Sequence, residues 1–104
     1  MTNFDEREKG FEAKFFHDQN IEFKIRSKRN NLLGQWAGEI IKAKDIKEYI
    51  KEVRISDLEK PGDDDIIDKI FKDFGINGIT IKREEIITKV DEFESIVRSD
   101  IKKE

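Results

Sequence analysis

Residues 21–42 read IEFKIRSKRNNLLGQWAGEIIK and carry a long apolar stripe. The stripe consists of five residues at helical spacings: Ile25, Leu32, Leu33, Trp36 and Ile40. Because residues three, four and seven apart share one face of an α-helix, this stretch is predicted to be a long core helix. A helix with one apolar face has to bury it, so the rest of the chain is expected to supply partners.

The stretch that follows has the signals of a shorter second helix. Asp45 and Glu48 have the spacing of a capping box, in which the Asp side chain accepts a hydrogen bond from a first-turn amide. The inner face is predicted to consist of four residues: Ile46, Tyr49, Ile50 and Val53. Residues 60–62, Lys-Pro-Gly, are expected to break the chain after it.

Two more helices are predicted beyond this break. Asp63, Asp64 and Asp65 stand where a helix begins and its positive dipole end favours acids, and Gly75 is expected to be the left-handed C-terminal cap. The apolar positions between them are Ile66, Ile67, Ile70, Phe71 and Phe74. After an extended connection at residues 76–82, a final stripe is formed by Ile86, Val90, Phe93, Val97 and Ile101. Four stripes that must face one another predict an all-α protein, a small four-helix bundle.

Length and composition exclude several classes of protein. The chain has 104 residues, 43% of them charged and 36% hydrophobic, with one Pro and no Cys, so we expect one domain without disulfides or cysteine-based metal sites. Apolar runs are too short for a membrane span or a signal peptide, so a soluble intracellular protein without membrane insertion is expected. Asp63–Asp65 lacks the spacing of a calcium loop, and helix capping is the favoured interpretation, so no metal site is predicted.

Catalysis is also not expected. The chain has one His, no Cys and no Gly-rich phosphate loop, so the usual nucleophile and base pairs lack members. His17 and Asp18 are adjacent, and adjacent helical side chains point about 100° apart, which favours a solvated or capping role for His17. The protein is therefore predicted not to be an enzyme.

Positive charge gathers in the middle of the chain. Residues 19–44 carry six bases and two acids, although the formal net charge of the whole chain is −3. Nucleic-acid binding is not favoured by this overall acidity. An adenine-nucleotide-responsive module is an alternative hypothesis, with candidate residues Lys24, Lys28, Arg29 and Trp36. Core packing of Trp36 and solvation of the lysines is the simpler interpretation.

The first 18 residues differ from the rest in that their apolar stripe is narrow and mainly aromatic. Phe4, Phe11 and Phe15 form a narrow aromatic stripe on a charged segment that contains Gly10. A helix of this length is marginal in water, so residues 1–18 are predicted to be a mobile segment, helical or disordered, attached to a bundle domain at 19–104. The phenylalanines either pack on that bundle, as in a plain helical scaffold, or enter a groove of another protein.

Four stretches of the sequence carry a resemblance to a known family. They are FDEREKGFEAKFFHD at 4–18, Phe23-Lys24, KRNNLLGQWA at 28–37 and KPGDDD at 60–65. Together they resemble the zeta subunit family, the ATPase inhibitor subunit of alphaproteobacterial F-type ATP synthases. The resemblance runs from Phe4 to the C-terminal helix and is most specific over the first 37 residues.

The resemblance implies a function and a set of contacts. It implies a four-helix bundle with an N-terminal segment that inserts into the enzyme head and blocks ATP hydrolysis. The insertion site would be a catalytic and rotor interface, which is formed by alpha, beta and gamma subunits. Carried over by position, the partner-binding residues are Phe4, Asp5, Arg7, Glu8, Phe11, Lys14, Phe15 and His17. The resemblance also implies a cytoplasmic protein, held at the inner face of the membrane through the ATP synthase. We expect it to be a monomer when free and to need no cofactor, with weak binding of adenine nucleotide belonging to the alternative hypothesis above.

Overall fold

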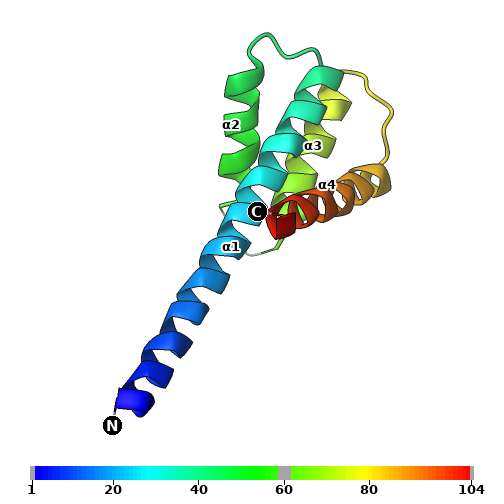
Figure 1. The fold of residues 1–104 in the computed structure, drawn as a ribbon. Coiled ribbons are helices and arrows are strands. Elements are labelled where there is room, and N and C mark those ends of the chain that lie inside the picture. The colour runs from blue at the N-terminus through cyan, green and yellow to red at the C-terminus, as the bar shows by residue number, and fades with distance from the viewer. Residues whose placement is uncertain (1, 59–61, 104) are drawn as a thin grey trace.

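The computed structural model describes the backbone of residues 2–58 and 62–103, and the side chains of residues 20–58 and 62–102. Four helices lie in these ranges: α1 (Thr2–Ile40), α2 (Ile46–Ser56), α3 (Asp64–Ile76) and α4 (Arg83–Lys103). Figure 1 shows α2, α3 and α4 gathered around the C-terminal half of α1. The prediction of an all-α four-helix bundle is confirmed, and the described residues contain no strand.

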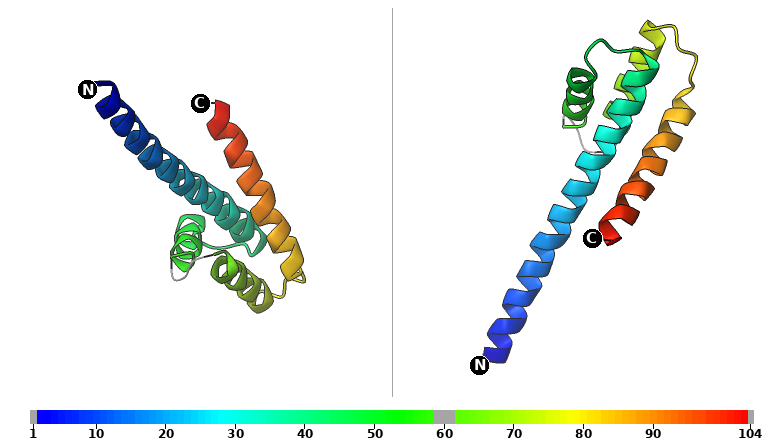
Figure 2. Two further views of the ribbon diagram at one scale, coloured as in Figure 1. Left: turned by 90° about the horizontal axis from the view of Figure 1, so that it is seen from below. Right: turned by 45° about the horizontal axis from the view of Figure 1, so that its top comes forward.

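The first helix is much longer than the predicted core helix. It runs without interruption for 39 residues, so the segment that the sequence left open between helix and disorder is helical and continues into the core helix. At a rise of about 1.5 Å per residue such a helix is about 58 Å long, close to the 66 Å extent of the whole molecule. Both views of Figure 2 show its N-terminal half projecting beyond the other three helices.

The core lies between the C-terminal half of α1 and the three shorter helices. Helix α1 contacts α2 and α4, and α3 contacts the same two helices. The cluster of buried side chains consists of Leu33, Ala37, Tyr49, Val53, Ile66, Ile67, Ile70, Phe74, Ile86 and Val90. All four predicted apolar stripes contribute side chains to this cluster. Phe71, which was predicted to belong to the stripe of α3, is exposed.

Two glycines set the spacing between α1 and α2. A methyl group built at Gly34 would lie 3.0 Å from the Ile50 Cα, and one at Gly38 would lie 3.2 Å from side-chain atoms of Ile46 and Tyr49. Contacts this short leave no room for a side chain on α1 opposite Ile50. Glycine at these positions therefore allows the two helix backbones to approach closely, at the cost of helix propensity.

The predicted cap at the beginning of α2 is confirmed, whereas the one predicted for the end of α3 is not. The Asp45 carboxylate accepts a hydrogen bond from the Glu48 amide at 3.1 Å, as the capping box predicts. The prediction for Gly75 is wrong, because α3 continues to Ile76 and the left-handed residue is Gly78, with φ +71°. The amides of Gly78 and Ile79 donate to the carbonyls of Gly75 and Phe74, which closes a Schellman motif at that later position.

The extended connection predicted at residues 76–82 is shorter in the structure, because Ile76 still belongs to α3 and residues 77–78 form a turn, so that only residues 79–82 lie outside helix and turn. Ile79 and Ile81 pack against the core, whereas Thr80 and Lys82 are exposed. This alternation is what period-two spacing produces in extended backbone. Within the described ranges, none of the four helices combines the length and apolar character needed to cross a bilayer.

Candidate functional site

The eight residues predicted to bind a partner all lie on the projecting half of α1. Phe4 to His17 fall inside one continuous helix, although their side chains are outside the described residues. The backbone also passes through residue 18, the predicted border between inhibitory segment and bundle, as regular helix. The division into two functional parts stays a prediction, and it does not coincide with a break in secondary structure.

The continuous helix places residues of the projecting half on the same face as residues of the buried half. Positions 11 and 29 are 18 residues apart, and so are positions 15 and 33, which is about five turns of an α-helix. Arg29 and Leu33 are both buried on the side of α1 that faces the bundle. The positions of Phe11 and Phe15 are therefore placed on a continuation of the helix face that the bundle covers.

A buried polar cluster lies at the base of the projecting half. Asn30 Nδ2 donates to Asp57 Oδ2 at 2.8 Å, and Arg26 Nε donates to the same oxygen at 2.7 Å. Asp57 is the C-cap of α2, where a carboxylate opposes the helix dipole, so these donors offset an unfavourable position. The hydrogen bond and the charge of Asp57 raise the pKa of Arg26 above its ordinary value, against the opposing effect of burial.

Arg29 connects this cluster to the remaining two helices. Its side chain is buried, with Nη2 3.0 Å from Asp63 Oδ1 before α3 and Nη1 3.3 Å from Glu94 Oε1 on α4. It also donates to Asn30 Oδ1 through Nε, at 3.0 Å. One guanidinium from α1 thus holds groups from the beginning of α3 and from α4, and this fixes the direction in which α1 leaves the bundle.

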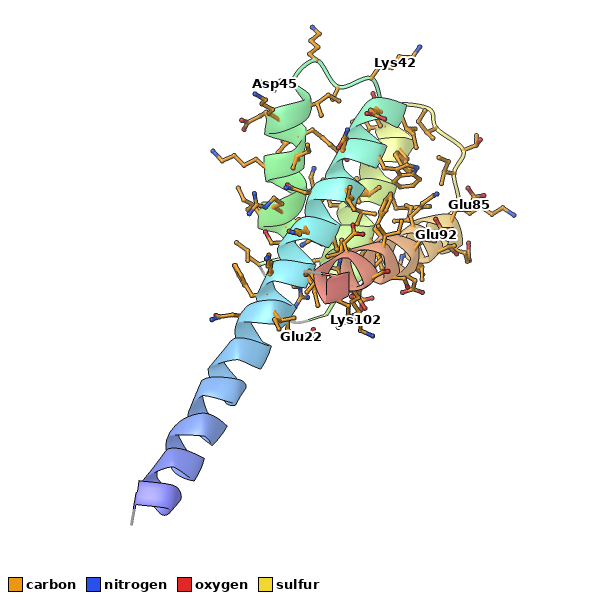
Figure 3. All side chains as sticks on the ribbon, viewed as in Figure 1. Glu22, Lys42, Asp45, Glu85, Glu92 and Lys102 are labelled. Atoms are coloured by element: carbon orange, nitrogen blue, oxygen red, sulfur yellow. The ribbon has the colours of Figure 1, made fainter. Side chains whose placement is uncertain are left out.

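A second, exposed pair lies one turn further toward the projecting half. Arg98 on α4 donates two hydrogen bonds to the Glu22 carboxylate, at 3.0 and 2.9 Å. These bonds lower the pKa of Glu22 below its ordinary value. Figure 3 labels Glu22 close to the C-terminal end of α4, which is marked by Lys102. Glu22 is the first described residue of α1 with a side-chain bond to another helix, so the projecting half begins just before it.

The candidate nucleotide residues are distributed over two sides of α1. Lys24 and Lys28 are exposed, whereas Arg29 is buried among its acid partners. Trp36 is half-buried, and its ring meets the Phe74 ring edge-on with 5.5 Å between centroids. The hollow that Lys28 lines is formed with Asn31 and Leu32 rather than with Arg29 or Trp36. The structure does not bring the four residues into one pocket, and nucleotide binding stays a prediction.

The triple acid stands at the beginning of α3, as predicted, but one of the three side chains does not cap the helix. Asp63 is the N-cap of α3, but its side chain makes no capping hydrogen bond and pairs with Arg29 instead. Asp64 and Asp65 occupy the first turn, where the helix dipole favours acids. Across the residues whose side chains are described, no three His, Cys, Asp or Glu groups are placed to hold a metal ion.

Sequence reasoning missed the polar cluster, although one signal for it was present. Arg29 lies four residues after Ile25 and four before Leu33, which places it on the apolar stripe. A charged residue on such a stripe is either buried with partners or interrupts the core. Asp57 and Glu94 carry no comparable signal, because their pairing with α1 depends on how the helices pack.

A family model described as ATPase inhibitor subunit zeta matches residues 1–100, and so covers both the projecting helix and the bundle. A search of curated proteins gave no match. The family match agrees with the resemblance carried by the N-terminal residues and with the four-helix architecture, and it describes a regulatory subunit rather than a catalyst. The chain therefore belongs to the ATPase inhibitor subunit zeta family.

Proposed function

We propose that this protein inhibits ATP hydrolysis by the F-type ATP synthase by inserting the N-terminal half of α1 at a catalytic and rotor interface of the enzyme head. The main support for this proposal is that α1 extends beyond α2, α3 and α4. The positions of Phe11 and Phe15 lie on the same face of this helix as the buried Leu33. Within the bundle, other helices cover that face. In the projecting half, a partner protein would do so.

Burial of the phenylalanines supplies the driving force for insertion. Each Phe side chain buries about 150–250 Å² when it enters an apolar groove, and such aromatic anchors dominate interface energies. The acids and bases between them, among them Asp5, Arg7, Glu8 and Lys14, would remain at the edges of the groove and orient the helix. This is the helix-in-groove mode of recognition.

The attachment of the projecting half to the bundle supports the same function. Because α1 continues into the core, the inserted part extends a helix that the bundle has already nucleated, which lowers the entropic cost of ordering it. The bundle also limits the depth of insertion. The molecule is 28 by 26 Å in its two shorter dimensions, whereas a groove for one helix admits about 10–12 Å.

The partners and location follow from this proposal. The inserted helix would contact alpha, beta and gamma subunits, because a catalytic and rotor interface is formed by all three. The protein would then be held at the membrane indirectly, through the ATP synthase, on the cytoplasmic side.

Inhibition of the isolated enzyme head tests the proposal. ATP hydrolysis by the head from the source organism, freed of endogenous inhibitor, would be measured against increasing concentrations of the protein. Saturable inhibition by the wild type is expected, and Phe11→Ala and Phe15→Ala should each weaken it by about 2–4 kcal/mol, as truncated interface anchors do. Ile76→Ala is the control, since Ile76 is an exposed residue at the end of α3. Equal inhibition by all variants would show that the phenylalanine face is not the active element.

A further inference from the structure

An apolar groove opens at the C-terminal end of α2, on the side of α1. Its volume is about 240 Å³, and three of its lining side chains are large, apolar and exposed: Phe23 (71%), Ile55 (50%) and Leu58 (78%). Single exposed apolar residues are ordinary on protein surfaces, but a cluster of them marks an interaction site. We call this surface the Phe23 groove, defined by these three residues with Lys51 and Arg54.

The groove continues the face of α1 that α2 covers. Further along α1, that face packs on α2 through Gly34, and Asn30 bonds to Asp57 at the end of α2. Phe23 precedes Asn30 by seven residues, which is about two turns, so it lies on the same side of α1. Helix α2 ends at Ser56, and the groove lies at this end, where Phe23 of α1 meets Ile55 and Leu58. A volume of this size fits one or two apolar side chains projecting from a helix that lies across the groove.

The charged side chains that the structure describes at the rim of the groove are basic. Lys51 and Arg54 are exposed there, and neither forms an ion pair with an acid whose side chain the structure describes. Arg54 Nη2 donates to Ser27 Oγ, a neutral group, at 3.2 Å. The acid lining the groove, Asp57, is buried and is neutralised by Arg26. An apolar floor with a basic rim is complementary to a helix whose apolar residues are flanked by Asp and Glu.

We propose that the Phe23 groove docks an acidic amphipathic helix on the outer surface of the ATPase head, as a second contact besides the inserted half of α1. This inference rests on the proposed function. If residues up to about 20 enter the head, the groove lies directly at the point of entry, because Phe23 follows within one turn and Leu58 is beside it. Two contacts on one molecule reinforce each other, since the first brings the second to its site at high effective concentration.

Binding of full-length variants to the isolated head tests the proposal. The double variant Phe23→Ser with Leu58→Ser should raise the dissociation constant about tenfold or more, while saturating concentrations still inhibit fully through the N-terminal half of α1. Ile76→Ser is the matched control, because Ile76 is 73% exposed and lies outside the groove. Since all three side chains are exposed, the thermal unfolding of the variants should match that of the wild type.

Charge reversal tests the predicted chemistry of the docked helix. Lys51→Glu with Arg54→Glu should slow association and reduce its dependence on salt, because rim charges act mainly on the encounter rate. Lys47→Glu, on the exposed side of the first turn of α2, is the control and should leave both unchanged.

The outcomes separate the two proposals. If the groove variants bind as tightly as the wild type while Phe11→Ala weakens inhibition, the groove proposal is overturned and the proposed function stands. If the wild type does not bind the head, both are overturned. If sedimentation shows that the free wild type is a dimer and that Phe23→Ser with Leu58→Ser converts it to a monomer, the groove is a contact between copies, and the docking proposal is overturned.

Discussion

The amide of Asn30 on α1 donates to the carboxylate of Asp57, the C-cap of α2, at 2.8 Å, and both residues are buried. Through Arg26 and Arg29 the same carboxylate belongs to the cluster that joins all four helices at the base of the projecting half. This small group of polar side chains therefore joins the helices at the point where the projecting half of α1 leaves the bundle.

Removing the central acid of this cluster should destabilise the bundle. Asp57→Ala is expected to lower the free energy of unfolding by about 3 kcal/mol, because it leaves Arg29 buried with fewer acid partners. Urea unfolding followed by circular dichroism measures the change. Asp91→Ala, at an exposed site on α4, should change stability by less than about 0.5 kcal/mol. Equal effects of the two substitutions would refute a structural role for Asp57.

The two glycines Gly34 and Gly75 should respond in opposite directions to the same substitution. Gly34→Ala is expected to destabilise by about 1–3 kcal/mol, because its methyl group would lie 3.0 Å from the Ile50 Cα and force α2 away. Gly75→Ala should stabilise by about 0.5–1 kcal/mol, because nothing lies within 4 Å of its added methyl group and alanine favours the helix. Melting temperatures of both variants check this, and stabilisation by Gly34→Ala would show that α1 and α2 are not closely packed in solution.

Tyr49 should make stability fall at alkaline pH. Burial, the hydrogen bond to Asp73 at 2.8 Å and the charge of Asp73 raise the pKa of Tyr49 above its ordinary value of 10.0. The folded protein then keeps the phenolic proton at pH values where the unfolded chain has lost it. This contribution is complete below about pH 10 and is lost progressively as the pH rises above it.

The comparison with Tyr49→Phe isolates this effect from the titration of lysines. The variant should be less stable by about 1 kcal/mol at pH 7, since it lacks the hydrogen bond. Between pH 9 and 11.5 its melting temperature should decline less steeply than that of the wild type. Parallel declines would show that Tyr49 is not protected in the folded state.

Gly10 offers a test of the projecting helix that leaves the bundle untouched. It lies in the interior of α1, where alanine favours helix by about 1 kcal/mol. If the N-terminal half of α1 binds as a helix, Gly10→Ala should lower the half-maximal inhibitory concentration about fivefold by preorganisation. Gly10→Pro should raise it strongly. A weaker inhibitor with alanine than with glycine would indicate that the partner's surface approaches the backbone at this position.

The adenine-nucleotide hypothesis can be examined through the single tryptophan. Trp36 packs against Phe74, and Arg29 is engaged by Asp63 and Glu94, so addition of ATP at about millimolar concentration should leave Trp36 emission unchanged. Amide spectra would report on Lys24 and Lys28 in the same titration. A saturable change in either signal would mean that nucleotide binds and that the interior of the bundle adjusts to it.

Much of the fold was predictable because local patterns and tertiary packing agree. The stripe of α4, with Ile86, Val90 and Val97 buried, and the Asp45 cap of α2 depend on neighbours within a few residues, and sequence reasoning identified both. The cap of α3 was missed because Gly75 and Gly78 both suit a left-handed turn. Which of them forms it depends on the burial of Phe74 and Ile79 against the core, which is not local information.

Only the part of the candidate site that depends on spacing within one helix was predictable from the sequence. The aromatic stripe of the N-terminal segment follows from spacing, but its register with the buried face depends on α1 being continuous through residue 18. The helix is continuous there even though the local sequence is charged and contains Gly10, because nothing in it forbids helical geometry. The Phe23 groove was not predictable, since it requires the position of the end of α2 against α1.

The continuity of α1 has a consequence for how the chain tolerates changes in length. An insertion of one residue between Phe15 and Ile25 would rotate everything before it by about 100° and move it by about 1.5 Å relative to the bundle. The aromatic face would then point away from the direction set by Arg29, although every contact in the core would remain intact. An insertion of seven residues would restore the direction to within about 20° and carry the face roughly 10 Å further from the bundle. The length of this stretch of helix therefore determines both the direction of the aromatic face and its distance from the bundle. Only insertions or deletions close to a whole number of helical turns preserve that direction.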